Sequence, residues 1–371
     1  LKAQRAPLPS LAPDPSRMAS AGLGFLLLLL AAVSGGLYTT PLGIAKTGWS
    51  FEAKWFLYSL LADIVFPWTV ALATVTDLLG TFRRAPGGKI ALTAFFGFLW
   101  GIGCQLFGLG VSMVGNSLAF ALILGLSATL GSVIPLVALH PDEVGSQAGL
   151  LNFAGLGLAV AALVLTAVAG RLKERDAAAV AAPGRLTAGS EAATDTSPSG
   201  EATSFSRGVV VCVLSGIFSG CLNLATSFGQ EISEAAVAAG TPRSMSTNAI
   251  YAISIAAGGI PSLVWCGYAM FARGERLCSH SRRSWVKNLV ATSTMGVLWF
   301  GSNVAHLHHR HGHGRQCQWP IYIIGMVVVA NVSGVLAGEW RLGSPKAKAW
   351  MGAGLVVLCL AIVAVGLAGV A

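Results

Sequence analysis

The sequence predicts an all-α membrane protein of ten transmembrane helices, arranged as two inverted repeats of five. Three observations lead to this prediction. Of the 371 residues, 54% are hydrophobic and only 11% are charged, whereas soluble domains average roughly 25% charged residues. The apolar residues are gathered in runs of about 20 that are apolar on all sides, as membrane-spanning helices require. Finally, the motif Gly97-Phe98-Leu99-Trp100 recurs in the second half as Gly296-Val297-Leu298-Trp299.

Ten apolar runs are long enough to be spans, and all 24 Lys and Arg fall between them. The first run contains Ala31-Ala32-Val33-Ser34, which resembles a signal-peptide cleavage site, but the nine runs behind it favour a retained helix. The 46 glycines let helices approach closely, and a barrel would instead alternate apolar and polar residues. The expected spans are 20–40, 55–79, 90–110, 117–139, 149–170, 208–229, 246–272, 288–306, 319–338 and 350–370.

A polar segment divides the chain into two halves. Residues 171–207 become rich in Ala, Gly, Ser and Thr without apolar periodicity, so we expect a disordered cytoplasmic linker. The five-helix halves are then 18–170 and 208–371, and 1–17 form a disordered extension ahead of Met18, the expected natural start. Because five spans precede the linker, the second half is inverted relative to the first. Inverted repeats let one central site face each side of the membrane in turn, which indicates transport.

The basic residues predict the orientation in the membrane. Nine of the 24 Lys and Arg lie on the side of the termini and 15 on the other. The positive-inside rule therefore places both termini outside and the linker in the cytoplasm. The net charge of +9 is thus a sign of topology, and it gives no reason to expect a nucleic-acid partner.

Short motifs spread from about residue 24 to 340 carry a family resemblance. They are Leu37-Tyr38 with Pro41, Pro67-Trp68, Leu99-Trp100-Gly101-Ile102-Gly103 with Gly108-Leu109, Leu172-Lys173-Glu174-Arg175, Ser215-Gly216-Ile217-Phe218-Ser219, Glu234-Ala235-Ala236 with Gly240 and Pro242, Gly258-Gly259, and Gly338-Glu339-Trp340. In this order and spacing the chain resembles the L-rhamnose–proton symporters of the drug/metabolite transporter superfamily. The resemblance implies ten spans in the cytoplasmic (inner) membrane and uptake of L-rhamnose or a related deoxyhexose with a proton.

A sugar site needs hydrogen-bonding groups for the hydroxyls and an aromatic surface for the C–H face of the ring. Six residues of these types lie within the expected spans and are the candidate substrate-binding residues: Trp100, Gln105, Asn223, Trp299, Asn303 and Asn331. The alternative is that a Trp anchors a helix at the interface and that a lone amide only bridges helices. Tyr38, at the end of a span, is expected to be an interface anchor or a gate.

Proton coupling requires a group that changes charge inside the membrane. Asp63 is the acid that lies well within a span, and a carboxylate there costs roughly 2.5–3.5 kcal/mol to insert. Asp63 is therefore the first candidate for the proton site, although it could instead pair with a polar group on a neighbouring helix. Glu234, in a segment that carries the resemblance, and nearby Glu231 are the alternatives.

The segment His306–Gln318 departs from the family pattern. It holds five of the seven histidines, and three readings remain open: a sequence artefact from a frame slip, a polar loop, or a metal site. The last would suit a metal-responsive membrane scaffold, the alternative of another class. A carrier for another small metabolite is the nearer alternative.

The sequence indicates neither an enzyme nor a cofactor. It contains no Walker-type loop, no His-Glu-x-x-His motif and no credible Ser/His/Asp set. The expected partners are a small sugar, a proton and the lipid bilayer, while the oligomeric state and the coupling ion are left open.

Overall fold

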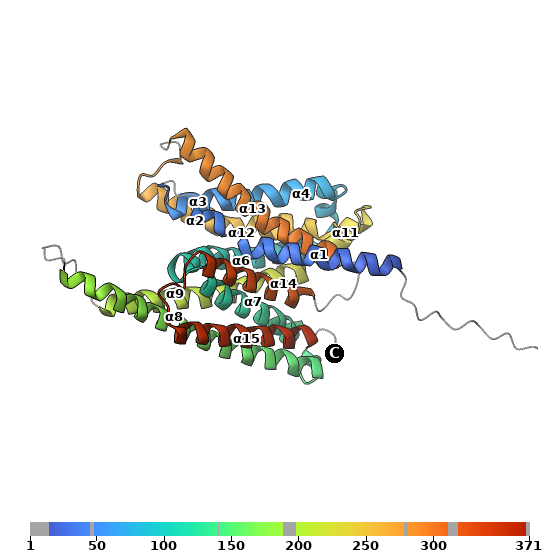
Figure 1. Cartoon of the computed structure of the whole chain (residues 1–371). Coiled ribbons are helices and arrows are strands. Elements are labelled where there is room, and N and C mark those ends of the chain that lie inside the picture. Colours follow the sequence, from blue (N-terminus) through green and yellow to red (C-terminus); the bar gives the residue numbers. More distant parts are fainter. Residues whose placement is uncertain are drawn as a thin grey trace, which may run out of the picture.

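The computed structural model describes residues 15–44, 48–139, 141–187, 198–277, 281–310 and 318–368, and these contain helices and no strand. Figure 1 shows the helices as one elongated bundle. The helices are α1 (Pro15–Leu37), α2 (Thr40–Ile44), α3 (Phe51–Ser59), the π-helix η1 (Leu60–Val65), α4 (Phe66–Thr74), α5 (Leu78–Arg84), α6 (Gly87–Val114), α7 (Asn116–Leu139), the 3₁₀ turn η2 (Pro141–Glu143), α8 (Gln147–Thr187), α9 (Pro198–Ser219), α10 (Cys221–Phe228), α11 (Gln230–Ala238), α12 (Thr247–Ala272), α13 (Arg282–Arg310), α14 (Gln318–Leu336) and α15 (Pro345–Ala368).

Nine apolar helical segments of the described chain match expected spans. Six are long enough to cross a bilayer, namely Phe51–Thr74, Gly87–Val114, Gln147–Ala177, Phe205–Ala238, Thr247–Ala272 and Pro345–Leu367. Three shorter ones are Leu26–Leu42, Asn116–Gly131 and Gly325–Leu336. The remaining expected span, 288–306, lies inside α13. The chain is therefore an all-helical, multi-pass membrane bundle, and the grouping into two inverted five-helix halves stays a prediction.

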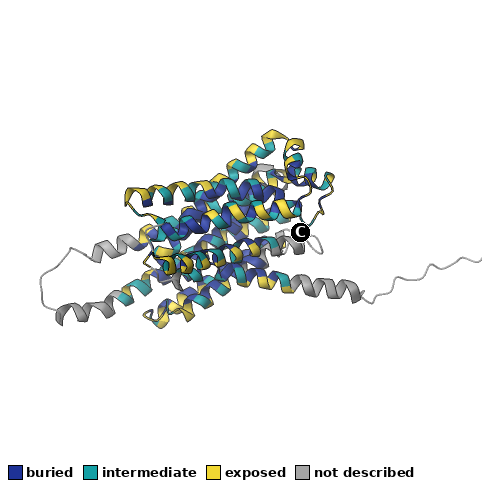
Figure 2. Cartoon of the chain, turned by 90° about the horizontal axis from the view of Figure 1, so that it is seen from above, coloured by how far each residue is buried: buried dark blue, intermediate teal, exposed yellow. Residues whose placement is uncertain are grey.

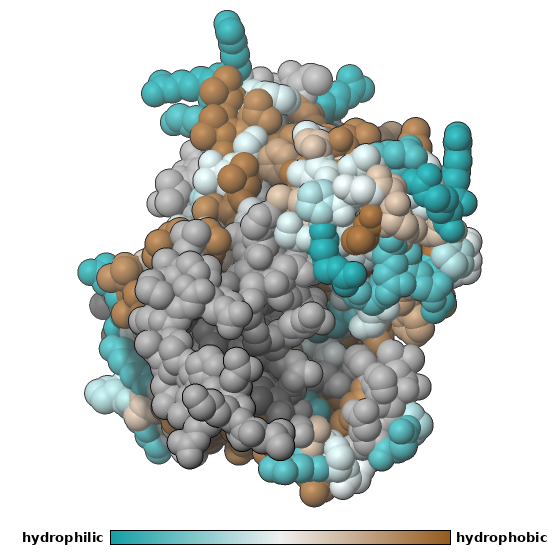
Figure 3. All heavy atoms as spheres, turned by 90° about the vertical axis from the view of Figure 1, so that its right-hand side faces the viewer, coloured by the Kyte–Doolittle hydropathy of each residue, from teal (hydrophilic) through white to brown (hydrophobic). Residues whose placement is uncertain are grey.

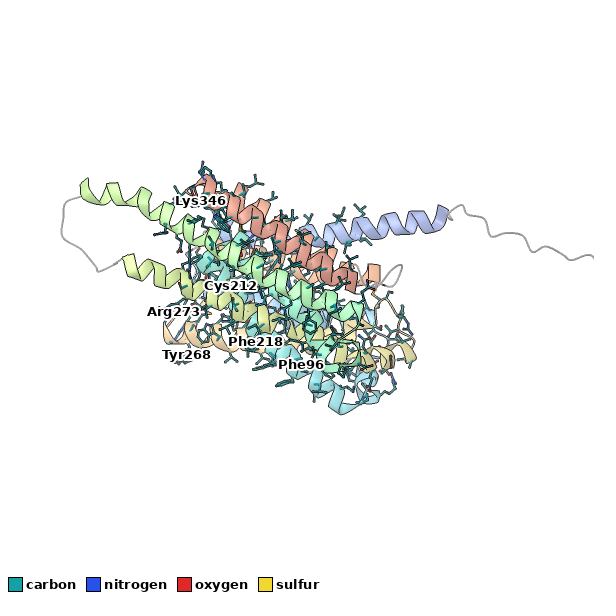
Figure 4. All side chains as sticks on the ribbon, turned by 90° about the horizontal axis from the view of Figure 1, so that it is seen from below. Phe96, Cys212, Phe218, Tyr268, Arg273 and Lys346 are labelled. Atoms are coloured by element: carbon teal, nitrogen blue, oxygen red, sulfur yellow. The ribbon has the colours of Figure 1, made fainter. Side chains whose placement is uncertain are left out.

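The outer surface of the bundle is apolar, as contact with lipid requires. Phe271 is 83% exposed, Leu336 82% and Tyr268 72%. Tyr268 is labelled at the margin of the bundle in Figure 4, and Figure 2 shows exposed residues along the outer faces of the helices and buried ones between them. Figure 3 looks onto one end, where hydrophilic residues gather on one side and hydrophobic residues reach the edge. Many large apolar side chains on the outer faces are typical of a bundle surrounded by lipid.

Glycine allows α6 to lie directly against α12. A Cβ at Gly97 would collide with the backbone of Ser254, and one at Gly101 with the backbone of Gly258. Inside a membrane no hydrophobic effect drives helices together, so they associate through close van der Waals packing. Small residues at a crossing make this close packing possible. This close crossing fixes the position of Trp100, which lies between the two glycines of α6.

The helices extend beyond the apolar runs at several points. Helix α8 continues to Thr187 and α9 begins at Pro198, so parts of the segment expected to be a disordered linker are helical, while 188–197 lie outside the described residues. In Figure 1 the end of α8 projects from the bundle beside α9. Likewise, α1 begins at Pro15, inside the expected N-terminal extension. Helices α8 and α15 pack along each other (Figure 1).

Long-range polar contacts tie the helices together at the end where α7 begins. The carboxylate of Glu339 accepts hydrogen bonds from the backbone N–H groups of Asn116 (3.0 Å) and Ser117 (3.1 Å), and so caps the N-terminus of α7 with a negative charge, where the helix dipole favours it. The hydroxyl of Thr39, just after α1, donates to the amide oxygen of Asn116 (2.7 Å). In Figure 4, Arg273 and Lys346 mark this end of the bundle.

Candidate functional site

A cavity lies among α6, α7, α9, α10, α13 and α14, next to Tyr38 at the end of α1. Its volume is about 80 Å³, several times the roughly 10–15 Å³ that one buried water needs. The lining combines three kinds of group: aromatic rings, amides or hydroxyls, and apolar side chains. The lining residues are Tyr38, Trp100, Cys104, Phe107, Leu124, Ser127, Ser219, Leu222, Asn223, Trp299, Asn303, Tyr322, Ile323 and Met326.

The two tryptophans of the repeated motif meet in this cavity. The rings of Trp100 and Trp299 are stacked, with centroids 5.5 Å apart and planes inclined by 19°. Trp100 is only 6% exposed, because its other side packs on Gly258, where a Cβ would come within 2.6 Å of Cζ3. Trp299 is half-buried. Trp100 therefore supports Trp299 from behind, and Trp299 has more free surface for a flat apolar ligand.

Two of the four predicted amides line the cavity with hydrogen-bonding capacity to spare. The Nδ2 group of Asn303 donates to the backbone oxygen of Trp299 (2.8 Å), which holds the side chain in place and leaves Oδ1 as an acceptor. The amide of Asn223 lies against Gly131, and no described residue forms a hydrogen bond with it. Hydroxyl groups of a ligand are suitable partners for both.

The other two predicted amides do not line the cavity. The Oε1 atom of Gln105 accepts a weak hydrogen bond from Sγ of Cys266 on α12 (3.6 Å). Asn331 donates to the backbone oxygens of Val327 (2.9 Å) and Ser117 (3.5 Å). Both side chains are at most 8% exposed. They match the bridging alternative, since each contacts a neighbouring helix.

Tyr38 sits in an aromatic cluster that closes one end of the cavity. It lies directly after α1, is 3% exposed, and has ring centroids 6.1 Å from Tyr58, 5.8 Å from Phe107 and 5.9 Å from Phe120. Phe107 lies near the end of α6 and Phe120 near the start of α7. The cluster therefore lies between the cavity and the end of the bundle where Glu339 caps α7, a position suited to a gate.

Asp63 is the only buried carboxylate among the described residues, at 0% exposure. It lies in η1, and a π-helical turn of this kind is often found at functional sites. The carboxylate interacts with the Ser59 hydroxyl, four residues earlier, but neither carboxyl oxygen has a partner in good hydrogen-bond geometry among the described residues. Asp63 packs against Gly259 of α12. A Cβ placed on Gly259 would come within 2.9 Å of the Cβ of Asp63.

The residues before Asp63 share this lack of partners. The Tyr58 hydroxyl, the Ser59 hydroxyl and the Trp55 indole N–H are all buried without a partner in good hydrogen-bond geometry among the described residues. Tyr58 also packs on Tyr38 of the cavity, and Asp63 is close enough to interact electrostatically with Tyr38 and with Cys104, which also lines the cavity. Buried polar groups are rarely left unpaired without a functional reason or a bound water or ion.

The acids outside the bundle core are differently placed. Glu231 forms an ion pair with Lys89 (2.8 Å), and Glu234 is exposed on α11. Asp77, in the loop before α5, accepts a hydrogen bond from the backbone N–H of Gly80 (3.0 Å) and pairs with Arg84 (3.1 Å). The hydrogen bond from Gly80 lowers the pKa of Asp77 most, and the contact with Arg84 lowers it further. Asp77 therefore stays ionised near neutral pH.

The histidine-rich segment falls largely outside the described residues. Helix α13 ends at Arg310 and α14 begins at Gln318, so 311–317 are not covered. Within the parts of the chain that the structure does describe, no group of three or more His, Cys, Asp and Glu residues could hold a metal ion.

Comparison with known proteins gives one family. The model of the family described as L-rhamnose-proton symport protein matches residues 18–371. Curated proteins named L-rhamnose-proton symporter are 23% identical in Cronobacter sakazakii and 25% identical in Yersinia pestis and Yersinia pseudotuberculosis, each over 358 residues that cover 93% of this chain and 97% of the relative. No solved structure matches the chain.

Proposed function

The chain belongs to the family of L-rhamnose-proton symport proteins, and we propose that it is a secondary active transporter that moves L-rhamnose or a related deoxyhexose together with a proton across the cytoplasmic membrane. It is a membrane carrier and not an enzyme. Full-length similarity to curated L-rhamnose-proton symporters supports the substrate and the coupling ion.

One observation carries the proposal: a cavity lined by stacked tryptophans and by two amides with unused hydrogen-bonding groups lies near the buried carboxylate of Asp63, which has no partner in good hydrogen-bond geometry among the described residues. Trp299 supplies the aromatic surface for the C–H face of the sugar, and Asn223 and Asn303 supply partners for its hydroxyls. The apolar part of the lining, which includes Ile323 and Met326, suits the methyl group that distinguishes a 6-deoxyhexose. Gln105 and Asn331 have a supporting role at the helix contacts behind this wall.

Asp63 is the proton carrier in this proposal, and Glu234 is the candidate if Asp63 is not. A buried acid without hydrogen bonds is stable when protonated, and it ionises only when rearrangement brings water or a polar group to it. Its link to the cavity runs through Tyr58 and Tyr38. Moving one charge with the sugar gains roughly 2.3 kcal/mol per 100 mV, which supports a sugar gradient of about 40-fold at about 1.4 kcal/mol per decade.

The architecture that serves this function is an inverted repeat of two five-helix halves, residues 18–170 and 208–371, joined by a linker in the cytoplasm. Trp100 and Trp299 belong to equivalent helices of the two halves in this proposal, and their stacking supports an axis of the repeat near the cavity. Both termini lie outside the cell in this proposal. Tyr38 and its aromatic neighbours then close the cavity on the cytoplasmic side.

The test is uptake of labelled sugars by the full chain in lipid vesicles. A panel of hexoses and 6-deoxyhexoses is offered with and without an imposed inward proton gradient. We expect L-rhamnose or a related deoxyhexose to accumulate above the external concentration only with the gradient. If no sugar is concentrated under any gradient while the protein remains folded, the proposal is wrong.

A further inference from the structure

A second hollow lies where α8 and α9 leave the bundle, at the end opposite the chain's C-terminus (Figure 1). Its volume is about 520 Å³, which falls within the usual range for small-molecule sites, roughly 300–1,000 Å³. Its walls carry two arginines, a serine and several apolar side chains. They are Arg171, Arg175, Ser206, Val168, Leu172 and Phe205, together with the acid Glu174. None of these residues lines the sugar cavity.

The position of this hollow along the helices places it at the membrane surface. Arg171 follows the start of α8 at Gln147 by about 36 Å, at 1.5 Å of helix rise per residue. That length crosses the hydrocarbon core, roughly 30 Å thick, and ends in the headgroup layer. On the other wall, Phe205-Ser206-Arg207 come directly before the apolar run of α9 that begins at residue 208. On both walls, α8 and α9, the sequence therefore changes from apolar to polar at about the same depth in the membrane.

The chemistry of the hollow is that of a phosphate site above an apolar floor. Arg171 and Arg175 lie one turn apart on one face of α8, both are exposed, and neither pairs with a described carboxylate. Guanidinium groups bind phosphate through two parallel hydrogen bonds. Phe205 is 3% exposed and packs on Gly170, so it forms a fixed floor that acyl chains can contact.

The neighbouring charged residues do not cancel this positive site. Lys173 points to a different neighbour, since its Nζ lies 4.9 Å from the centre of the Trp340 ring. Glu174 lines the same hollow and is the one described carboxylate there. Two positive charges therefore face a single negative one, which favours an anionic headgroup over a zwitterionic one.

We propose that this hollow binds an anionic phospholipid, with the phosphate on Arg171, Arg175 and the Ser206 hydroxyl and the acyl chains against Val168, Leu172 and Phe205. Basic pockets between membrane helices near the cytoplasmic surface recognise such headgroups. The bound lipid would fill the gap between α8 and α9 and hold the two helices at a fixed distance where they leave the bilayer. The site does not depend on the sugar or on the proton.

The test measures thermal unfolding of the full chain in detergent, with phosphatidylglycerol or phosphatidylcholine added at increasing concentration. Phosphatidylglycerol should raise the midpoint more than phosphatidylcholine does. In the variant Arg171→Gln/Arg175→Gln, loss of two charges at about 1 kcal/mol each should raise the lipid concentration of half effect about 30-fold. Arg171→Lys/Arg175→Lys keeps the charge and should fall between the two.

The matched control is Arg282→Gln/Arg283→Gln, which removes two exposed arginines at the start of α13, at the same end of the bundle (Figure 1). It should respond to phosphatidylglycerol as the wild type does. Equal weakening in both double Gln variants would show an effect of net charge and would overturn the site. An equal rise with both lipids, or with inorganic phosphate alone at the same concentration, would overturn it as well.

Discussion

Two buried polar regions lie side by side in this bundle, and they are built differently. In the cavity, the amides of Asn223 and Asn303 face open space in which a ligand can meet them. Around Asp63, polar atoms are buried against protein and have no partners. The first region, a cavity of about 80 Å³, offers amides and aromatic rings, and in the proposed function it is where the sugar binds. The second region has no open space for a ligand, and what can change there is the protonation of Asp63.

The contrast explains how one carrier can couple two unlike substrates. An ionised, unpartnered carboxylate in the membrane interior is costly, so in the proposed mechanism Asp63 loses its proton only when the helices around it rearrange. Tyr38 belongs to the wall of the cavity and packs on Tyr58, which lies five residues before Asp63. The proposed mechanism uses this contact, because it joins the cavity wall to the segment that carries the acid.

The largest expected effect is that of Asp63→Asn, which imitates the protonated state. Accumulation of sugar, about 40-fold per 100 mV for one co-transported charge, should fall to equality across the membrane. Exchange of internal for external sugar should continue, because exchange needs reorientation of the site and no net proton release. Uptake and exchange in vesicles measure both.

The matched controls for Asp63 are the acids Glu231 and Glu234. Glu231 is paired with Lys89 and Glu234 is exposed, so Glu231→Gln and Glu234→Gln should accumulate sugar nearly as the wild type does. If Asp63→Asn accumulates normally and Glu234→Gln does not, the two regions have been assigned wrongly and the proton site lies on α11.

The second effect in size is that of Trp299→Ala, which removes the aromatic surface of the cavity. Aromatic contacts contribute about 0.5–1.5 kcal/mol beyond area burial, so the apparent affinity for sugar should fall about tenfold while the pH dependence of uptake stays the same. Trp265→Ala is the control, because Trp265 is 60% exposed on the outside of α12. Equal loss of affinity in the two variants would count against the stacking role.

Smaller effects are expected at the amides. Asn223→Ala and Asn303→Ala each remove groups available to a sugar hydroxyl, at about 0.5–1.5 kcal/mol per hydrogen bond, so the affinity should fall about threefold to tenfold. Gln105→Leu and Asn331→Leu should leave the affinity unchanged and lower the unfolding temperature, because these side chains contact neighbouring helices. Titration of sugar binding and thermal unfolding separate the two outcomes.

The smallest effect concerns an acid that is solvated rather than buried. The N–H of Gly80 and the guanidinium of Arg84 lower the pKa of Asp77, so its contribution to stability is fully present above the unfolded-state pKa, about 3.9, and is lost as the pH falls through the lower folded value. Asp77→Asn should therefore unfold slightly earlier than the wild type at pH 6, and the difference should shrink below about pH 4. Its transport should match the wild type, in contrast to Asp63→Asn.

Two features of the candidate site could be predicted from the sequence: the pair of tryptophans and the buried acid. A repeated Gly-x-Leu-Trp motif predicted that Trp100 and Trp299 border one cavity, and the two rings are in contact there. Asp63 was visible as a charge within an apolar run. Periodicity cannot reveal the π-turn around Asp63 or the unpartnered hydroxyls of Tyr58 and Ser59, because these depend on how neighbouring helices pack.

The amides show a second limit of sequence reasoning. Asn303 and Asn331 are the same residue type within apolar helices, yet the first lines the cavity and the second bonds to Val327 and Ser117. Tyr322 also lines the cavity, held by the Ser302 hydroxyl (2.6 Å), and no motif marked either residue. Which face of a helix meets the cavity is decided by the packing of the whole bundle.

The central claim, that sugar moves together with a proton carried by Asp63, is tested most directly by the pH of a weakly buffered medium around vesicles containing the protein. Adding the transported sugar without an imposed gradient should make the external medium more alkaline with the wild type, and an uncoupler should abolish the change. Asp63→Asn should still bind and exchange the sugar but give no change in pH. A wild-type protein that takes up sugar with no pH change, or an Asp63→Asn variant that alkalinises the medium as the wild type does, would contradict the claim.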